Sequence, residues 1–341
     1  MNEKIEKASI YPKVLIFPIT YKCNARCSMC NIWRCDSSTE MSLNDIKAIF
    51  SDKILCDNLE SVNLTGGEPM LREDILQIIE IIILHCRNVH TITLNTNGYF
   101  NEKYKDFFDG VQDIKKRVRE FDFLVYFSID GLYEKHDLIR GVKGFFEHLI
   151  KTLEEMNKIE QQYGIKYSLN FTISPYNYRE MSIVANYAKN RKINLDFTFS
   201  MPSEVYFNNV FEKELWEYDN GALMEICETI DSLLNENVLT YSRAYYRNLI
   251  KMLKGGKRQI GCIFKEEGLF LKPDGNVYKC WADNKLLGNI YQEPISKIWS
   301  NCVVNYKVEE LEEKCRNCYN NCYVSFQRNQ SIKSLYNGIK K

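Results

Sequence analysis

Residues 23–30, Cys23-Asn24-Ala25-Arg26-Cys27-Ser28-Met29-Cys30, place three thiols within eight residues, in the spacing C-x3-C-x2-C. Structural zinc sites normally complete four protein ligands, whereas three thiolates on a four-iron cluster leave one iron open to a non-protein ligand. The loop is short enough for each thiolate to reach a different iron. The spacing therefore favours an iron–sulfur site. A structural zinc loop, or cysteines that pack as small apolar residues, remain as alternatives.

The same spacing, directly after a short apolar strand, resembles the signature of the radical S-adenosylmethionine (SAM) enzymes. The resemblance implies that Cys23, Cys27 and Cys30 hold a catalytic 4Fe-4S cluster, and that the amino and carboxylate groups of SAM chelate the open iron. It also implies that one-electron reduction, by a flavodoxin- or ferredoxin-type donor, cleaves SAM to a 5′-deoxyadenosyl radical. Met29 stands where the family places a bulky apolar residue against the adenine.

The composition argues against two classes of partner. The 341 residues carry 45 Lys and Arg against 45 Asp and Glu, so the formal net charge is zero, unlike that of most nucleic-acid-binding proteins. The longest apolar run, at residues 78–84, contains a Glu and is typical of a buried helix and not of a membrane span. Thirteen cysteines without an export signal predict a reducing, cytoplasmic location and metal ligation.

Apolar strand-like segments alternate with helical segments through most of the chain. This alternation predicts parallel strands joined by right-handed crossovers, and six such units predict an α/β fold, a partial (β/α)6 barrel of the radical SAM type. The active site of such a barrel lies at the carboxyl ends of its strands. The predicted strands are residues 13–19, 61–65, 91–94, 123–129, 167–173 and 195–199, and the predicted helices include 43–54, 73–85, 103–120, 145–162 and 178–190.

The predicted division of the chain has five parts. An N-terminal tail at 1–12 precedes the barrel at 13–202, and a helical region at 203–255 ends at the helix-breaking Gly255-Gly256. A small Cys-rich domain with a β-hairpin and a helix follows at 256–330, and a tail at 331–341. The segment after the last barrel strand would cover the open side of the barrel, where the candidates for substrate contact are Met201, Tyr206, Phe207, Asn208 and Asn209.

Gly66-Gly67-Glu68-Pro69, at the end of the second predicted strand, resembles the GGEP motif of the family. Two glycines let the backbone approach a ligand closely, since a side chain would prevent it. Strand-end carbonyls, with Glu68, would accept hydrogen bonds from the ammonium group of SAM. An ordinary Gly-Gly turn is the alternative for the pair, and a structural cap is the alternative for Glu68.

Other polar residues follow the later strands. Ser128 and Asp130 resemble the fourth-strand motif of the family, whose polar residues face the ribose of SAM. Arg140 resembles an arginine that pairs with the SAM carboxylate in several members, because its guanidinium is a planar fork. Asn97 and Thr172 are further candidates for contact with SAM. A surface salt bridge is the alternative for Arg140, and a structural cap for Asp130.

Five further cysteines lie in the C-terminal part of the chain. Pro273-Asp274-Gly275 is a strong turn signal, so residues 268–271 and 276–279 should pair as a hairpin. That hairpin would bring Cys262 and Cys280 near one another. The five are Cys262, Cys280, Cys315, Cys318 and Cys322.

The pattern C-x12-G-x4-C followed by C-x2-C is similar to the SPASM/Twitch extension of a subset of radical SAM enzymes, which holds auxiliary 4Fe-4S clusters. A complete SPASM domain has seven cysteines and two clusters, whereas the tail here reads C-x2-C-x3-C, without the longer spacing and without a final downstream cysteine. The resemblance implies one auxiliary cluster, held by Cys262, Cys280, Cys315 and either Cys318 or Cys322. A zinc ribbon is the alternative. The remaining cysteines are interpreted as packing residues: Cys35, Cys56, Cys86, Cys227 and Cys302.

The resemblance does not reach the substrate. An auxiliary cluster favours a net oxidation of a peptide or of a sugar-like small molecule, because a redox-neutral rearrangement needs no electron acceptor. A redox-neutral epimerase or isomerase is one alternative, and a non-catalytic zinc- or cluster-binding regulatory module is another. We find no N-terminal winged-helix domain of the kind that captures leader peptides, which weakens the peptide hypothesis without removing it.

Overall fold

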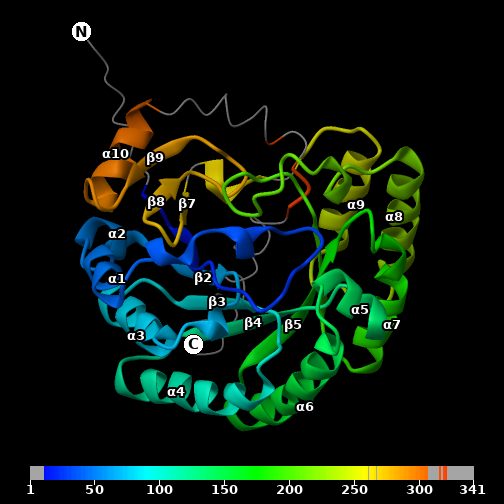
Figure 1. Cartoon of the computed structure of the whole chain (residues 1–341), viewed down its shortest axis with the longest axis horizontal. Coiled ribbons are helices and arrows are strands. Elements are labelled where there is room, and N and C mark those ends of the chain that lie inside the picture. Colours follow the sequence, from blue (N-terminus) through cyan, green and yellow to red (C-terminus); the bar gives the residue numbers. More distant parts are fainter. Residues whose placement is uncertain (1–10, 260, 266, 306–314, 316–317, 321–341) are drawn as a thin grey trace, which may run out of the picture.

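The computed structural model describes residues 11–259, 261–265, 267–305, 315 and 318–320. Among these residues one sheet has the strand order β6-β5-β4-β3-β2-β1-β7-β8-β9 (Figure 1). All neighbouring pairs from β6 to β7 are parallel, and β8 is antiparallel to both of its neighbours. The predicted α/β partial barrel is therefore confirmed. The strands are β1 (Val14–Thr20), β2 (Ser61–Gly66), β3 (Thr91–Thr96), β4 (Asp122–Ser128), β5 (Lys166–Ile173), β6 (Leu195–Phe199), β7 (Gly268–Leu271), β8 (Asn276–Tyr278) and β9 (Leu286–Asn289).

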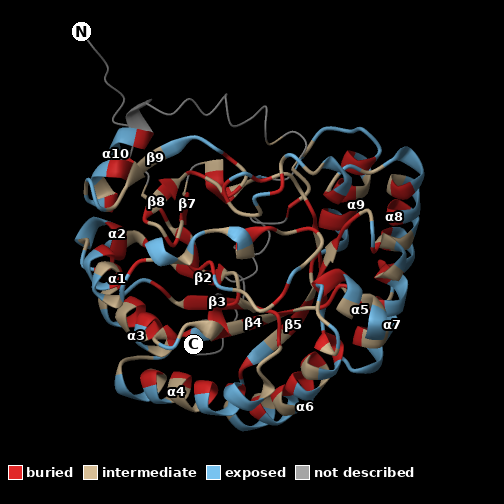
Figure 2. Cartoon of the chain, in the orientation of Figure 1, coloured by how far each residue is buried: buried red, intermediate tan, exposed pale blue. Residues whose placement is uncertain are grey.

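Helices cover the outer face of the parallel strands, and the side of the helical ribbons that faces the sheet is coloured as buried (Figures 1 and 2). Helix α3, for example, buries Ile78, Ile79, Ile82 and Ile83, which recur at the spacing of one helix face. Such burial provides most of the stability of a helix in a protein. The helices of this layer are α1 (Leu43–Ile49), α2 (Lys53–Asn58), α3 (Ile75–His85), α4 (Tyr104–Arg117), α5 (Tyr133–Arg140), α6 (Phe145–Tyr163) and α7 (Met181–Asn190).

Two helical segments differ from the sequence prediction. The helix expected at 43–54 is two helices, because the carboxylate of Asp52 accepts the N–H groups of Ile54 and Leu55 and so caps a new helix, α2. Helix α5 was not predicted. It ends at Gly141, whose φ of 68° is the left-handed conformation that glycine adopts most easily.

The inner face of the barrel is polar. In β4, Phe123, Val125 and Phe127 are buried against the helices, whereas Tyr126 and Ser128 alternate with them and face the interior. Neighbouring strands repeat this alternation, so amide and hydroxyl side chains line the inside of the barrel: Asn63, Asn95, Tyr126, Asn170 and Thr198. A polar interior leaves room for a polar ligand, which a packed apolar core would not.

The C-terminal part continues the barrel sheet. The predicted hairpin is confirmed, since Phe270 of β7 pairs with Tyr278 of β8 and Leu271 pairs with Val277. β7 also lies parallel to β1, with Ile16 opposite Phe270, so the hairpin is joined to the barrel by backbone hydrogen bonds. Helix α10 (Ile295–Asn305) follows β9 and lies near α1 and α2 in Figure 1.

Helices α8 (Asn220–Leu233) and α9 (Arg243–Leu253) follow β6 in the chain, pack against each other and lie near α7 (Figure 1). The segment between them adds a short parallel bridge, in which Leu239 pairs with Leu195. This bridge satisfies part of an edge that would otherwise present unpaired backbone groups. Within the described ranges, no helix is long and apolar enough to cross a membrane.

Candidate active site

The loop that carries the three thiols begins at the carboxyl end of β1 and is fixed by backbone contacts. The N–H groups of Arg26 and Ser28 donate to the last two carbonyls of α5, each at 2.8 Å. The N–H of Asn31 donates to the carbonyl of Phe207, also at 2.8 Å. Gly141 is required beneath this contact, because a Cβ atom there would overlap the carbonyl oxygen of Arg26. Helix α5 therefore sets the height of the loop over the barrel.

A cavity of about 250 Å³ lies between this loop and the carboxyl ends of the strands. Cys23, Cys27 and Cys30 all border it. Glu68 does not, and of the substrate candidates Tyr206 and Phe207 do. The predicted SAM contacts that line the cavity are Met29, Gly66, Gly67, Asn97, Ser128, Asp130, Arg140 and Thr172.

The Gly-Gly pair packs against protein backbone as well as facing the cavity. Gly66 has φ +140°, and a Cβ atom on it would overlap the carbonyl oxygen of Thr20. A Cβ atom on Gly67 would overlap the carbonyl oxygen of Lys22. The N–H of Gly67 donates to the carbonyl oxygen of Thr20 at 2.8 Å, and the N–H of Glu68 donates to the carbonyl oxygen of Lys22 at 2.8 Å. The glycines therefore let β2 end directly against the start of the cysteine loop.

The carboxylate of Glu68 is fully buried and joins the ends of β2 and β3. It accepts the N–H of Met70 at 2.9 Å, the hydroxyl of Thr96 at 2.7 Å and the N–H of Asn97 at 2.8 Å. Burial raises the pKa of Glu68, and these three donors oppose the rise. This arrangement fits the structural-cap alternative. Asn97 reaches the cysteine loop, where its side-chain amide donates to Asn24 at 2.8 Å.

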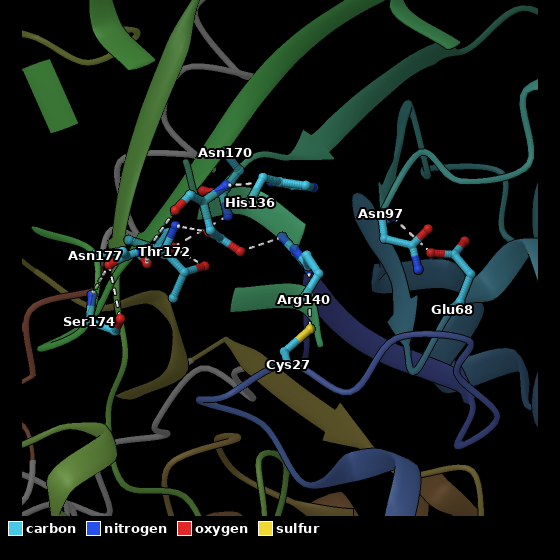
Figure 3. Close-up of polar contacts among 11 residues, drawn as sticks. Cys27, Glu68, Asn97, His136, Arg140, Asn170, Thr172, Ser174 and Asn177 are labelled. Carbon is cyan, nitrogen blue, oxygen red and sulfur yellow. Dashed lines mark hydrogen bonds and ion pairs between the residues drawn. The ribbon is translucent and has the colours of Figure 1, made fainter. Parts of the chain in front are cut away.

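Asp130 and Arg140 form a buried ion pair beside the thiols (Figure 3). Arg140 Nη2 lies 2.6 Å from Asp130 Oδ2, and Arg140 Nη1 donates to the sulfur of Cys27 at 3.5 Å. Burial alone would lower the pKa of Arg140, but the neighbouring Asp130 and Cys27 raise it, so the guanidinium stays charged. The surface salt bridge that was the alternative for Arg140 is therefore not what the structure shows. Arg140 and Asp130 are both buried, and the guanidinium contacts the Asp130 carboxylate and the Cys27 thiol together.

His136 holds the turn that carries Asp130. The N–H of Asp130 donates to His136 Nδ1 at 3.1 Å, and the Asp130 side chain accepts the N–H of Thr172 at 2.9 Å (Figure 3). His136 is fully buried, and burial lowers its pKa well below the usual value, so the ring is neutral. Asn177 completes the turn by donating to the carbonyl of Asp130 at 3.1 Å. The sequence alone gives His136 no role beyond that of a structural residue near the rim of the barrel.

The residues around the thiols fit an iron–sulfur cluster. The N–H of Ala25 donates to the sulfur of Cys23 at 3.4 Å, and hydrogen bonds of this kind tune cluster thiolates. Burial raises the pKa of Cys23 to about 12, so the free thiol is uncharged and must lose its proton to bind metal. Three buried polar atoms near the loop have no hydrogen-bond partner within the described part of the chain: Asn24 Nδ2, Ser28 Oγ and Arg140 Nε. Of the three residues only Arg140 lines the cavity, and its orphaned Nε fits a group that occupies the cavity.

Nowhere in the described ranges do three His, Cys, Asp or Glu side chains surround one point closely enough to hold a single ion. A cubane cluster does not need such convergence, since each thiolate binds a different iron.

One wall of the cavity is aromatic and comes from segments far apart in the sequence. The hydroxyl of Tyr206 forms a hydrogen bond with the hydroxyl of Thr65 at 2.7 Å. The ring of Tyr206 packs edge-on against Phe270 of β7. Phe207 packs against Trp281, at 5.5 Å between ring centroids. Sequence reasoning missed Phe270 and Trp281, because only the parallel pairing of β7 with β1 brings them to the barrel mouth.

Four of the five C-terminal cysteines lie in the described part. Cys262 and Cys280 both pack against the apolar cluster of Val14, Ile263 and Phe264. Burial, followed by the nearby Cys262 and Cys318, raises the pKa of Cys315 to about 11. Cys322 lies outside the described residues.

Arg258 ties two of these cysteine-bearing segments together. Its guanidinium donates to the carbonyls of Gly261, Cys318 and Asn320. Asn320 in turn lines the cavity and donates to the sulfur of Met201 at 3.1 Å. The C-terminal cysteine segment therefore reaches the mouth of the barrel.

Two of the remaining cysteines touch each other. Cys56 and Cys86 are buried with their sulfur atoms 2.8 Å apart, behind the barrel and away from the cavity. Cys227 and Cys302 are also buried. This burial agrees with their interpretation as packing residues.

Comparison with known proteins identifies the family. Residues 17–186 match the radical SAM superfamily, and residues 262–319 match the SPASM iron–sulfur cluster-binding domain. The chain belongs to the radical SAM superfamily. It is an enzyme with a SPASM domain, so the non-catalytic zinc module is wrong, and its cofactors are a SAM-bound 4Fe-4S cluster and auxiliary iron–sulfur.

Several curated radical SAM proteins are similar over most of their length. An AdoMet-dependent heme synthase of Methanosarcina barkeri is 25% identical over 90% of this chain and 88% of its own. A cysteine-type anaerobic sulfatase-maturating enzyme of Clostridium novyi is 26% identical over 93% of this chain and 88% of its own. Among solved structures, Streptococcus suis SuiB with S-adenosylmethionine has a TM-score of 0.61 at 16% identity over 93% of this chain and 74% of its own. At this identity the structural likeness supports the fold alone.

Proposed function

We propose that this radical SAM enzyme oxidises a peptide by hydrogen abstraction, with an auxiliary 4Fe-4S cluster as the electron acceptor. The observation that carries the proposal is that one cavity is bordered both by the cysteine loop and by Trp281, the residue after Cys280. A substrate in this cavity would lie between the two cluster sites. Residues 13–202 would hold SAM, 203–255 would cover the substrate, and 256–330 would hold the auxiliary cluster.

The proposed roles of the residues follow from their contacts. Cys23, Cys27 and Cys30 would bind three irons, and bound SAM supplies, after one-electron reduction, the radical that abstracts hydrogen. Arg140 already donates to the Cys27 sulfur, and its orphaned Nε is left for the SAM carboxylate. Asp130 keeps the guanidinium in place. Gly66 and Gly67 would present backbone groups, while Glu68 supports Asn97 from behind.

The remaining predicted SAM contacts have more limited roles. Ser128 and Thr172 would face the ribose from β4 and β5. Met29 is buried in the cavity wall, as an adenine contact requires. All of these residues orient SAM and exclude water, and none needs to change its protonation state.

The charge of the cavity favours a peptide over a polycarboxylate. The charged residues among its lining are Asp130 and Arg140, and they pair with each other. A coproporphyrin, the kind of compound that one relative is named for making, carries several carboxylates that would find no further cation among the described residues of this wall. A peptide backbone suits the amides and hydroxyls of Asn95, Asn170 and Thr198, and the sulfatase-maturating relative acts on a protein.

The auxiliary cluster would be held by Cys262, Cys280, Cys315 and one of Cys318 and Cys322. Burial and the nearby Cys318 raise the pKa of Cys262, and Cys262 and Cys318 both lie close enough to raise the pKa of Cys315 as well. The sulfur of Cys280 accepts the N–H of Ala282 at 3.4 Å, and these contacts support the set. An electron from the substrate radical would pass to this auxiliary cluster. A redox-neutral epimerase would not need this acceptor.

Two measurements test the proposal. Anaerobically purified protein reduced with dithionite should release 5′-deoxyadenosine from SAM, and no release would refute the enzyme's proposed chemistry. A peptide library incubated with enzyme and SAM should then yield a product lighter by about two hydrogens, with SAM consumed in each turnover. A product of unchanged mass would rule out oxidation and favour the epimerase.

A further inference from the structure

Cys56 and Cys86 form a pair of thiols that the proposed chemistry does not use. Cys56 lies in the last turn of α2, and Cys86 is the C-cap of α3. Both side chains are buried, and the sulfur of Cys86 donates to the sulfur of Cys56 at 2.8 Å. A disulfide bond has a length of about 2.05 Å, so a shift of roughly 0.8 Å would bring the two atoms to bonding distance.

Neighbouring contacts hold the segments that carry the two thiols. The guanidinium of Arg119 donates to the carbonyl of Cys86 at 2.8 Å. The side chain of Asn88 joins the two segments, because it donates to the carbonyl of Asp57, the residue after Cys56, at 2.6 Å. The pair is therefore preorganised, and little conformational freedom is lost when a bond forms between the sulfur atoms.

The position of the pair admits a small oxidant more easily than a large one. Asp57 and Arg87, which follow the two cysteines in the chain, are exposed, whereas the cysteines are buried. Opening of the last turn of α2, a helix of six residues, would let a molecule of the size of hydrogen peroxide reach the sulfur atoms. A larger thiol such as glutathione has poorer access, which disfavours a mixed disulfide.

We propose that Cys56 and Cys86 are a site of oxidative modification, at which hydrogen peroxide converts the two thiols into a disulfide that ties α2 to α3. The chain between them carries β2, the Gly-Gly pair and Glu68. Neither cysteine lines the cavity, so the bond leaves the active site open. Its effect is on stability, because a disulfide that closes a loop restricts the unfolded chain. The site does not depend on the proposed substrate or reaction.

The contact between the two sulfur atoms sets the order of the reaction. The hydrogen bond to Cys56, followed by burial, raises the pKa of the Cys86 thiol, so Cys86 keeps its proton and Cys56 reacts first. The sulfur of Cys56 attacks one oxygen of the peroxide, the O–O bond breaks, and a sulfenic acid forms as one water leaves. The sulfur of Cys86 then attacks that of Cys56, the S–O bond breaks, and the thiol proton leaves in a second water. The two thiols lose two electrons, and one peroxide is reduced to two waters.

Peptide mapping tests the site, because tryptic cleavage gives two adjoining peptides, residues 54–72 and 73–87, each with a single cysteine. Cluster-loaded protein is treated with hydrogen peroxide, unreacted thiols are blocked with N-ethylmaleimide in denaturant, and the digest is analysed by mass spectrometry. We expect the two peptides to be joined, with a mass lower than their sum by about two hydrogens. Recovery of both peptides with N-ethylmaleimide attached would overturn the proposal.

Cys227 is the matched control, because it is buried to the same extent as Cys56 but its sulfur contacts the carbonyl of Ile250, at 3.9 Å. It should stay a free thiol under the same treatment, and disulfides that include Cys227 would show unselective oxidation and refute the site. In Cys86→Ser the sulfenic acid of Cys56 has no partner thiol, so dimedone should trap it. A folded Cys86→Ser variant without that adduct would contradict the proposed reaction.

Thermal unfolding followed by circular dichroism tests the effect of the bond. Peroxide also attacks iron–sulfur clusters, so the wild type is compared with Cys56→Ser after the same treatment. Relative to the untreated proteins, the melting temperature of the wild type should gain on the order of 5 °C over that of Cys56→Ser, and a thiol reductant should abolish the gain. Equal shifts in the two proteins would show that the bond does not tie α2 to α3.

Discussion

Replacing Asp130 by Ala would test whether the buried ion pair organises the site. The substitution leaves the guanidinium of Arg140 buried without its carboxylate, and it removes the acceptor of the Thr172 N–H. Removing one partner of a buried pair typically costs 3–5 kcal/mol, because the remaining charge stays out of water, so we expect about 4 kcal/mol here. The double variant Asp130→Ala/Arg140→Met removes the stranded charge and should recover part of that loss.

The matched control is Glu225→Ala, which breaks the Arg179–Glu225 pair on the surface. The Arg179 side chain there is 72% exposed and its charge is screened by water, so the loss of stability should be small. Unfolding in urea, followed by circular dichroism on anaerobic protein, compares the variants. If Asp130→Ala loses no more stability than Glu225→Ala, or if the double variant loses the sum of its two single changes, the pair does not organise the site.

Three further predictions concern the turn, the glycines and the clusters. Burial depresses the pKa of His136 in the folded state, so the unfolded chain binds more protons below the usual histidine pKa of about 6.5, and stability should fall as pH falls through that value. The variant His136→Asn keeps an acceptor for the Asp130 N–H, and it should reduce the slope of unfolding free energy against pH by up to about 1.4 kcal/mol per pH unit in urea titrations. An unchanged slope would contradict the assignment. Gly67→Ala should lower the iron bound at the N-terminal loop, because the new methyl group would overlap the carbonyl oxygen of Lys22. Gly164→Ala, which is strained at its φ of +69° but has no atom near the new methyl group, should bind iron as the wild type does. Replacing Cys23, Cys27 and Cys30 by Ala should leave about four irons per chain at the auxiliary site, as measured by iron analysis. A folded variant without iron would refute the model of two separate sites, and about eight irons per chain would show a second auxiliary cluster.

Local sequence patterns were sufficient for most of the fold. Strands and helices have their own hydrophobic periods, so the six barrel strands and most of their helices could be predicted from neighbouring residues alone. The Pro273-Asp274-Gly275 turn likewise announces its hairpin, because Gly275 takes a φ of +80° that favours glycine. Helix α5 escaped prediction, since its eight residues are mostly polar and its register depends on docking against the cysteine loop.

The candidate site divides in the same way. The three thiols and the Gly-Gly pair belong to short motifs, so their spacing could be recognised in the sequence alone. The partners that surround them could not. His136 beneath Asp130, and Phe270 and Trp281 on the aromatic wall, are brought there by strand pairing and loop docking. Contacts between distant segments depend on how the chain closes on itself, so only the tertiary structure could decide them.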